Sequence, residues 1–387
     1  MKNSGNFLPY QYEADAPLSV RHSYLQEQFS DYRIIFEKIA SVIEAGDYTL
    51  GRMVDLLEAE LCEYLEVNNV VSVGSGTDAI YLSLRAHGVG HGDQVLVPSY
   101  TFYATAGAVV KTGASPVFCD VGPDGNVRVS DLEGALAYAP RCKAIVPVHW
   151  TGRPVDVTEV SKFAAGNGLS VIYDACHAVG AYVGGLPVAA QGCASAFSLH
   201  PLKNLNVWGD GGFIATGNSE LANKLKIMRN HGLIDRDTCI EFSVNSRLDT
   251  VQAAVASHLL KKLPEITAAR INNAQQLDRQ LEDIGELQIV DRDPNIKEVF
   301  HLYSFRADRR DHLAKYLREK GIDAKVHYPI PLHKQPAAAP YLIHGIDYSN
   351  SEDLAASTIS LPVHEFVTER QLNEMALLIK SFYASPL

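Results

Sequence analysis

Residues 197–212 read FSLHPLKNLNVWGDGG and join a short apolar run to a lysine and a glycine-rich turn. The apolar run is typical of a buried strand, and the glycines that follow let the backbone approach a ligand closely. The amine of Lys203, placed between these features, is the group that an enzyme needs to hold an aldehyde cofactor as a Schiff base. Most lysines are solvated surface charges, so this interpretation depends on the motifs that accompany Lys203 along the chain.

Residues 169–173 (LSVIY) form a second strand-like run, which ends in Asp174. Open α/β sheets place their ligand-contacting groups at the carboxyl ends of such strands. Pyridoxal phosphate needs a carboxylate there, because the negative charge keeps the pyridine nitrogen protonated and the ring can then act as an electron sink. The alternative is an aspartate that caps the following turn. The presence of Lys203 downstream favours the cofactor.

Residues 71–84 (VSVGSGTDAIYLSL) read as a strand, a glycine turn and the start of a helix. Backbone N–H groups at the start of a helix, with small residues that let an anion approach, make a cradle for phosphate. The turn lacks the third glycine of the dinucleotide-binding fingerprint and the Gly-Lys-Ser/Thr of a nucleoside-triphosphate loop. An ordinary strand-to-helix turn is the alternative. Taken with Lys203 and Asp174, the turn favours a phosphate site.

Short runs rich in valine, isoleucine or alanine alternate along the chain with stretches of helical spacing. This alternation predicts an α/β fold with a mainly parallel sheet flanked by helices and with ligand groups at the strand ends. The expected strands of this sheet are residues 69–73, 94–98, 115–119, 143–148, 169–173, 194–198 and 212–215.

A long helix is expected to begin near Thr250 and to run toward Ala269, linking the large domain to a smaller carboxyl-terminal α/β part. Within that part, residues 299–305 look like a strand and residues 310–319 like a helix. We therefore expect a large domain with the amino-terminal segment in residues 1–250. The interdomain helix and the smaller domain would occupy residues 251–387.

Several further ordered blocks surround these three motifs, and together they resemble the DegT/StrS-type sugar aminotransferases, which use pyridoxal phosphate. The resemblance covers nearly the whole chain. Two positions depart from common family patterns: His177 stands where glutamine is frequent, and Trp208 where a smaller residue is often seen. The matching blocks are SGTDA (75–79), PSYTF (98–102), PVH (147–149), DACHA (174–178), the lysine segment with GDGG (209–212), RNHG (229–232), NSRLD (245–249) and HYPIPLH (327–333).

The resemblance implies the type I, aspartate aminotransferase-like fold of pyridoxal-phosphate enzymes, with a seven-stranded sheet in the large domain. It also implies roles for single residues. Lys203 would be tether and general acid/base, and Asp174 the partner of the pyridine nitrogen. The further cofactor-binding residues would be Phe102 on the ring face, His177 at the 3′ oxygen, Ser198, Gly76, Thr77 and Asp78 at the phosphate, and Asn245 at the phosphate of the neighbouring subunit.

Because Asn245 would complete a partner's site, the resemblance implies a homodimer with shared active sites. His327, Tyr328 and His333 would lie in a loop over the substrate entrance, with a rigid proline-turn scaffold as the alternative. For Phe102, the alternative is an ordinary core phenylalanine.

The implied activity is transfer of an amino group from L-glutamate, which leaves 2-oxoglutarate, to a keto sugar. The acceptor would be a nucleotide-linked 3-keto or 4-keto deoxy sugar, and the kinetics ping-pong. A sugar dehydratase of the same family carries histidine in place of the lysine, so Lys203 weighs against it. A non-catalytic regulatory homologue would not need Lys203 and Asp174, and a nicotinamide dehydrogenase needs an acidic residue after a complete glycine fingerprint.

The bulk properties of the chain agree with a cytoplasmic enzyme. Its 387 residues suffice for a large and a smaller domain, each with a core. The net charge of −11 argues against nucleic acid or an anionic membrane surface as the main partner. The amino terminus has no apolar signal core, and no run approaches the length needed to cross a bilayer.

The cysteines and histidines do not indicate a metal site. The six cysteines are scattered without a Cys-x-x-Cys pair, which favours reduced, mostly buried thiols. None of the fourteen histidines forms a His-Glu-x-x-His motif, and His327 and His333 have no carboxylate cluster nearby in the sequence. We therefore expect no metal.

Overall fold

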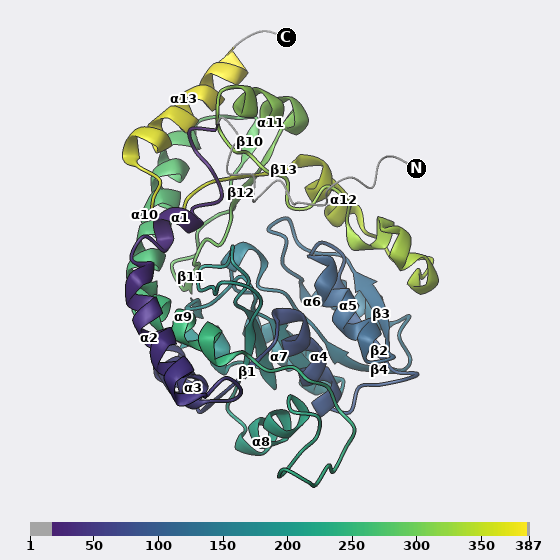
Figure 1. Ribbon diagram of the computed structural model, residues 1–387. Helices are drawn as coiled ribbons and strands as arrows, with labels where there is room; N and C mark the ends of the chain where they lie inside the picture. The colour runs from purple at the N-terminus through teal and green to yellow at the C-terminus, as the bar shows by residue number, and fades with distance from the viewer. Residues whose placement is uncertain (1–17, 385–387) are drawn as a thin grey trace, which may run out of the picture.

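The computed structural model describes residues 18–384, and its centre is a seven-stranded sheet (Figure 1). The strand order is β1-β9-β8-β5-β4-β2-β3. The strands from β8 to β3 pair in parallel, whereas β9 lies antiparallel between β1 and β8. The bounds are β1 Asn69–Val73, β2 Gln94–Pro98, β3 Ser115–Cys119, β4 Cys142–Ile145, β5 Ser170–Asp174, β8 Ala194–Ser198 and β9 Gly212–Thr216.

Helices cover both faces of this sheet because successive side chains of each buried strand point to opposite sides. In β2, Val95 and Val97 pack with α4, α5 and α8 on one face, whereas Leu96 packs with α6 and α7 on the other. On that second face, α3 and α9 cover the sheet toward β1. The helix bounds are α1 Leu25–Gln28, α2 Tyr32–Ala45, α3 Arg52–Leu65, α4 Gly76–Ala86, α5 Tyr103–Lys111, α6 Val129–Leu136, α7 Val157–Gly166, α8 Ser219–Met228 and α9 Thr250–Leu260.

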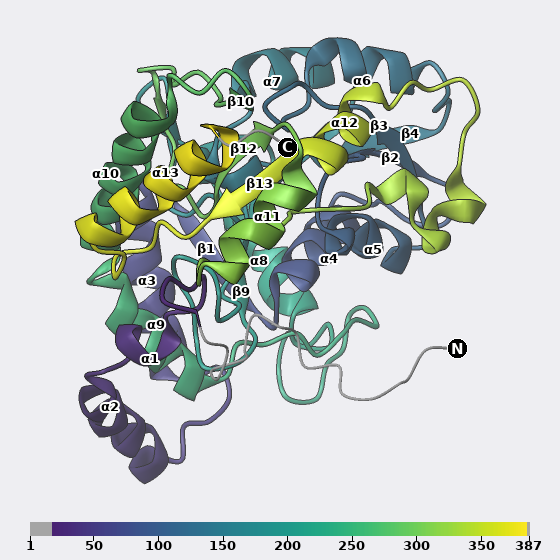
Figure 2. The same ribbon diagram turned by 90° about the horizontal axis from the view of Figure 1, so that it is seen from above.

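A smaller carboxyl-terminal part packs helices against a three-stranded antiparallel sheet of order β10-β12-β13 (Figures 1 and 2). Its apolar cluster also takes in Val20, which forms a bridge with Ile322. A third small sheet has the order β11-β6-β7. The remaining bounds are β6 Tyr182–Val183, β7 Leu186–Pro187, β10 Leu287–Gln288, β11 Ile296–Lys297, β12 Tyr303–Ala307, β13 Thr358–Leu361, α10 Leu263–Leu281, α11 Arg310–Glu319, α12 Ser349–Ser357 and α13 Glu369–Ala384.

The seven expected strands of the main sheet are all present, with ends displaced by a few residues at most. The helix expected at residues 310–319 is also present. The single long helix expected from Thr250 toward Ala269 is wrong: α9 ends at Leu260 and α10 begins at Leu263. Pro264 lies in the first turn of α10, where its missing N–H costs nothing, so a new helix starts there.

The strand expected at residues 299–305 begins only at Tyr303. Phe300 has a φ of 44°, a left-handed conformation that ends an extended strand. The division of the chain at residue 250 remains a prediction. Within residues 18–384, no helix is both long and apolar enough to span a membrane.

Candidate active site

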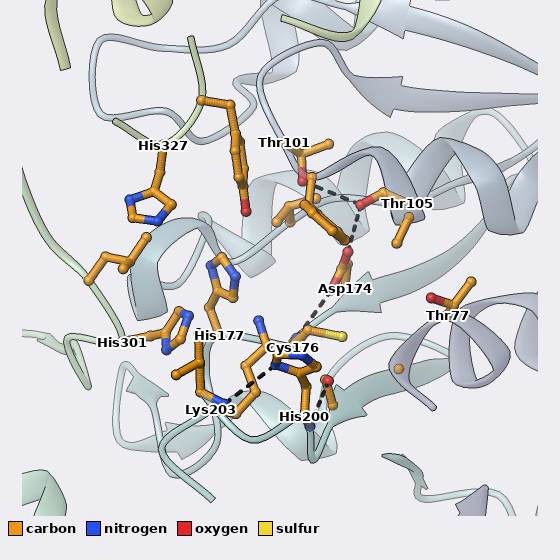
Figure 3. A pocket seen from close by; sticks show the side chains of 18 of the residues that line it. Thr77, Thr101, Thr105, Asp174, Cys176, His177, His200, Lys203, His301 and His327 are labelled. Carbon is orange, nitrogen blue, oxygen red and sulfur yellow. Dashed lines mark hydrogen bonds between the residues drawn. The ribbon is translucent and has the colours of Figure 1, made fainter. Parts of the chain in front are cut away.

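A cavity of about 600 Å³ opens at the carboxyl ends of the parallel strands, between the main sheet and the carboxyl-terminal part (Figure 3). Segments far apart in the sequence meet in its wall. Most of the residues singled out in the sequence line this cavity, namely Gly76, Thr77, Phe102, Asp174, His177, Ser198, Lys203, His327 and Tyr328.

The loop that carries Lys203 joins β8 to β9 and is closed at its base by backbone hydrogen bonds. The N–H of Leu199 donates to the carbonyl of Gly211 (2.8 Å), and the N–H of Val207 donates to the carbonyl of Leu199 (2.9 Å). The side-chain amide of Asn206 donates to the carbonyl of Lys203 (2.8 Å). These bonds fix the backbone from which the lysine side chain extends.

The amine of Lys203 has no hydrogen-bond or ion-pair partner among the described residues. Burial lowers the pKa of this amine, and the nearby Cys176 and Asp174 offset the effect only in part. A larger fraction of the amine is therefore neutral near pH 7 than for a surface lysine. A neutral amine is the form that reacts with a carbonyl carbon and that accepts a proton.

Asp174 is the last residue of β5, and its buried carboxylate has two donors but no cation within ion-pair distance in the described part of the chain. The hydroxyl of Thr105 donates to Oδ2 (2.8 Å), and the N–H of Cys176 donates to Oδ1 (3.1 Å). Thr101 contacts the Thr105 hydroxyl in turn (3.3 Å). A negative charge held in this way fits a positively charged ligand group in the cavity.

The N-terminus of α4 forms a candidate anion-binding site at Gly76 and Thr77, which we call the phosphate seat. Ser75 caps the helix by accepting a hydrogen bond from the N–H of Asp78 (3.1 Å), and the N–H groups of Gly76 and Thr77 have no acceptor among the described residues. A Cβ atom on Gly76 would lie 2.7 Å from Cβ of Ser198, and one on Gly212 would lie 2.5 Å from the carbonyl carbon of Ser75. The turn at Ser75 and Gly76, the end of β8 and the start of β9 therefore approach so closely that only glycine fits at these two positions. The small residues and free donors suit a phosphate group.

The carboxylate of Asp78 points away from this seat. It accepts hydrogen bonds from Nζ of Lys111 (2.7 Å) and from Oγ of Ser246 (2.8 Å). The backbone N–H of Asp78 donates a hydrogen bond to Oγ of Ser75, so Asp78 stabilises the turn. Asp78 itself does not line the cavity.

Phe102 and Tyr328 form an aromatic wall of the cavity. Their ring centroids lie 5.7 Å apart, and Phe102 also packs on Tyr103 at 3.9 Å. The hydroxyl of Tyr100 donates to the carbonyl of His327 (2.6 Å) and accepts from the N–H of Tyr328 (3.0 Å). This pair of bonds holds the loop that carries Tyr328 against the segment that follows β2. Phe102 is 39% exposed, so its ring can serve as a stacking surface.

His333 and Asn245 do not line the cavity. Nδ1 of the buried His333 lies 2.5 Å from Oγ of Ser99, Nε2 lies 3.1 Å from a carboxylate oxygen of Glu352, and its ring stacks on Tyr348 at 4.1 Å. These contacts favour the scaffold interpretation for His333. Asn245 is exposed and pairs with Asn230 through a backbone bridge.

The cavity wall also contains polar and aromatic residues to which the sequence analysis gave no role, nine of which are named below. The amino-terminal segment and the carboxyl-terminal part contribute most of them, and no local spacing signals that they converge. Thr105 lies one helical turn after Thr101, a spacing that could have been noticed. These nine residues are Thr101, Thr105, His22, Tyr24, His200, Arg270, His301, Lys325 and His364.

A comparison with known protein families finds one match, which spans residues 31–379. The chain belongs to the DegT/DnrJ/EryC1/StrS aminotransferase family. The aminotransferase is 36% identical over 363 residues to the pleiotropic regulatory protein of Geobacillus stearothermophilus, covering 93% of this chain and 97% of that protein. It is 37% identical over 325 residues to the dTDP-3-amino-3,4,6-trideoxy-alpha-D-glucose transaminase of Streptomyces venezuelae, covering 84% and 86% of the two chains.

Among solved structures, the aminotransferase resembles S. venezuelae DesV in complex with a ketimine intermediate. The TM-score is 0.91 at 34% identity, and the match covers 95% of this chain and 99% of that chain. The predicted fold class is thereby confirmed, and the cofactor of the family is pyridoxal 5′-phosphate. The cavity fits this group, because it combines an unpartnered amine, a buried carboxylate and a seat for phosphate.

Proposed function

We propose that this enzyme transfers an amino group from L-glutamate to a nucleotide-linked 3-keto or 4-keto deoxy sugar in the cytoplasm. The observation that carries the proposal is the convergence of Lys203, Asp174 and the start of α4 in one cavity. The transaminase from S. venezuelae, whose name contains a dTDP-linked amino sugar, supports this class of acceptor. The described cysteines are all free, in keeping with a reducing compartment.

Each group of the site has a distinct task in this reaction. Bound there, pyridoxal 5′-phosphate would supply an electron-withdrawing ring. Lys203 would hold its aldehyde carbon and, once displaced by the amino donor, would use Nζ to carry a proton from the donor carbon to the former aldehyde carbon. Asp174 would keep a proton on the pyridine nitrogen. Ser198 and the N–H groups of Gly76 and Thr77 would bind the phosphate, and Phe102 would stack on the ring.

A panel of nucleotide amino sugars tests the acceptor class. With 2-oxoglutarate as the amino acceptor, we expect the enzyme to consume an amino sugar linked to dTDP or UDP and to form L-glutamate. Coupled detection of glutamate measures the rate, and the visible spectrum follows the cofactor. Simple amino acids offered as donors with keto acids serve as the control. If these pairs react and no nucleotide sugar does, the proposed substrate class is wrong.

We further propose that the active form is a homodimer in which Asn245 reaches the phosphate of the neighbouring subunit. Asn245 is exposed and lies outside the cavity of its own chain, as such a role requires. Nearby in the same loop, Phe242 is fully exposed (100%) and Ile240 is 60% exposed. Exposed apolar side chains so close together favour contact with a second protein surface, and we assign that surface to a second copy of this chain.

Mixing two inactive variants tests the shared site. Lys203→Ala and Asn245→Asp should complement each other, because one site of the heterodimer then has both an intact lysine and an intact asparagine from its partner. The aspartate is chosen because its charge repels phosphate. Subunit exchange must be confirmed separately, and the Asn245→Asp homodimer must be clearly impaired. Activity no higher than the sum of the separate variants would show that Asn245 does not act in trans.

A regulatory role is the second candidate, because the Geobacillus relative is named a regulatory protein. A binding protein without catalysis would have no need of a reactive amine beside a buried carboxylate. The presence of Lys203 and Asp174 in one cavity therefore favours the enzyme.

A further inference from the structure

His177 and His301 lie against each other in the wall of the cavity (Figure 3). Their ring centroids are 4.3 Å apart, with an angle of 41° between the rings. His177 follows β5, whereas His301 precedes β12 of the carboxyl-terminal part. The contact therefore joins two segments that are distant in the sequence.

The backbone holds His301 in place through several contacts. The N–H of Val299 donates to the carbonyl of Gly152 (3.1 Å), and the N–H of Leu302 donates to the carbonyl of Thr151 (3.2 Å). Thr151 and Phe300 have φ angles of 58° and 44°, which residues other than glycine rarely adopt. Strained backbone of this kind persists where surrounding contacts over-determine it, and it is common at functional sites.

Gly152 makes this arrangement possible. A Cβ atom there would lie 2.8 Å from the carbonyl oxygen of His177 and 3.1 Å from the N–H nitrogen of His301. The turn thus passes between the backbones of the two histidines.

Two further side chains bind the segment that carries His301. The guanidinium of Arg270 donates to the carbonyl of Phe300 (3.1 Å), and the amide of Asn204 donates to the carbonyl of Val299 (3.0 Å). Asn204 directly follows Lys203, so the histidine segment is connected to the lysine loop. The position of His301 is therefore fixed relative to the centre of the site.

No hydrogen bond orients the ring of His177 within the described residues. Its Nδ1 atom is buried without a partner, and so is Nδ1 of His301. A hydrogen bond at one ring nitrogen commonly fixes the tautomer and the orientation of a functional histidine. For His177, packing must set the ring orientation instead, and the neighbouring rings are His301 and, at 5.8 Å, Trp150.

Both imidazoles are neutral near pH 7. Burial lowers the pKa of His177 well below its usual value, and Lys203 and His327 lower it further. Burial also lowers the pKa of His301 well below its usual value. Four nearby side chains lower it further, namely His177, Lys203, Arg270 and His327. A neutral ring has one N–H to donate, so its orientation decides whether a ligand receives it.

We propose that His301 is a positioning residue, which holds the ring of His177 so that Nε2–H points at the 3′ oxygen of the cofactor. The inference rests on the proposed function and on the role at the 3′ oxygen that the family resemblance implies for His177. A side chain at position 301 that keeps the ring contact should keep this hydrogen bond. A side chain without a ring should lose it.

The comparison of His301→Phe with His301→Leu tests this inference. The readout is the pH midpoint of the visible absorbance of the cofactor-loaded enzyme. Losing a donor to the 3′ oxygen makes that oxygen more basic, so we expect the leucine variant to raise the midpoint by about one pH unit. The phenylalanine variant should keep the midpoint of the parent. His312→Leu, which alters an exposed histidine on α11, is the matched control and should also leave it unchanged.

The same substitution made in the His177→Gln variant separates a positioning role of His301 from a direct contact with the cofactor and from a merely structural role. In His177→Gln there is no ring to orient, so adding His301→Leu should not shift the midpoint further. An equal shift in both backgrounds, or no shift in either, overturns the inference. His301→Asn, a second ring-free variant, should behave as the leucine variant does and covers the case that leucine prevents folding.

The parent enzyme distinguishes failure of the inference from failure of the proposed site. If borohydride does not fix cofactor to Lys203 in the parent, the proposed site itself is wrong. If labelling succeeds and the His301 variants behave like the parent, only the role of His301 is wrong.

Discussion

Lys203→Ala is expected to reduce turnover by about 10⁴-fold or more, because one amine serves as both tether and proton carrier. The fold should persist, since the loop is closed by backbone bonds that do not involve the Lys203 side chain. Some non-covalent cofactor binding should persist as well, because the phosphate seat and Asp174 are unchanged. Turnover is measured with the best amino sugar of the panel, and binding by equilibrium dialysis.

The matching chemical test is borohydride reduction followed by mass spectrometry. We expect the cofactor on a peptide that contains Lys203 and not on one that contains Lys325, the other lysine in the cavity wall. Lys325 lies 3.4 Å from a carboxylate oxygen of Asp323, whereas Lys203 has no such partner in the described chain. Labelling of Lys325, or of any lysine other than Lys203, would overturn the assignment.

Asp174→Asn is expected to lower turnover by a factor on the order of a thousand, comparable to the loss of one strong electrostatic stabiliser. The substitution removes the charge but nearly keeps the shape. The N–H of Cys176 and the hydroxyl of Thr105 remain in place around the new amide. The effect should therefore report the charge that holds the pyridine nitrogen protonated.

Thr105→Val is the matched control for this prediction. It removes one hydrogen bond to Asp174 and leaves the negative charge, so the loss should be about tenfold, in the range of a bond to a charged group. Single-turnover absorbance measurements isolate the chemical steps. Near-parental turnover in Asp174→Asn, or equal losses in both variants, would contradict the role given to the charge.

The main sheet could be predicted from the sequence because its strands are buried on both faces. Runs such as residues 94–98 are then apolar throughout, and each is bounded by a turn. The helix near Thr250 is harder to delimit, since apolar spacing continues across Lys261 and Lys262 although one helix ends and another begins there. Periodicity reports a buried face and does not report a short interruption between two helices.

The central cofactor-binding residues Lys203, Asp174 and Gly76 could be predicted because each lies at or just after the end of a strand of the main sheet. The remainder depends on tertiary contacts. His301 lies on a segment held by tertiary contacts, in which Phe300 and the neighbouring Thr151 take left-handed conformations that no composition signals. Asp78 has the right position in the chain, but its carboxylate is bound by Lys111 and Ser246, two partners that are distant in the sequence.

The close approach of Gly212 to the turn at Ser75 has a consequence for ligand affinity. The same strand that begins at Gly212 ends the closed loop of Lys203, so the spacing between the main chain of Lys203 and the phosphate seat is set by the backbone. The backbone of the loop and the turn then has little conformational entropy left to lose when the ligand arrives, because its ordering took place when the chain folded. Tight retention of the cofactor between turnovers would then come as much from the rigidity of the empty protein as from the contacts made on binding.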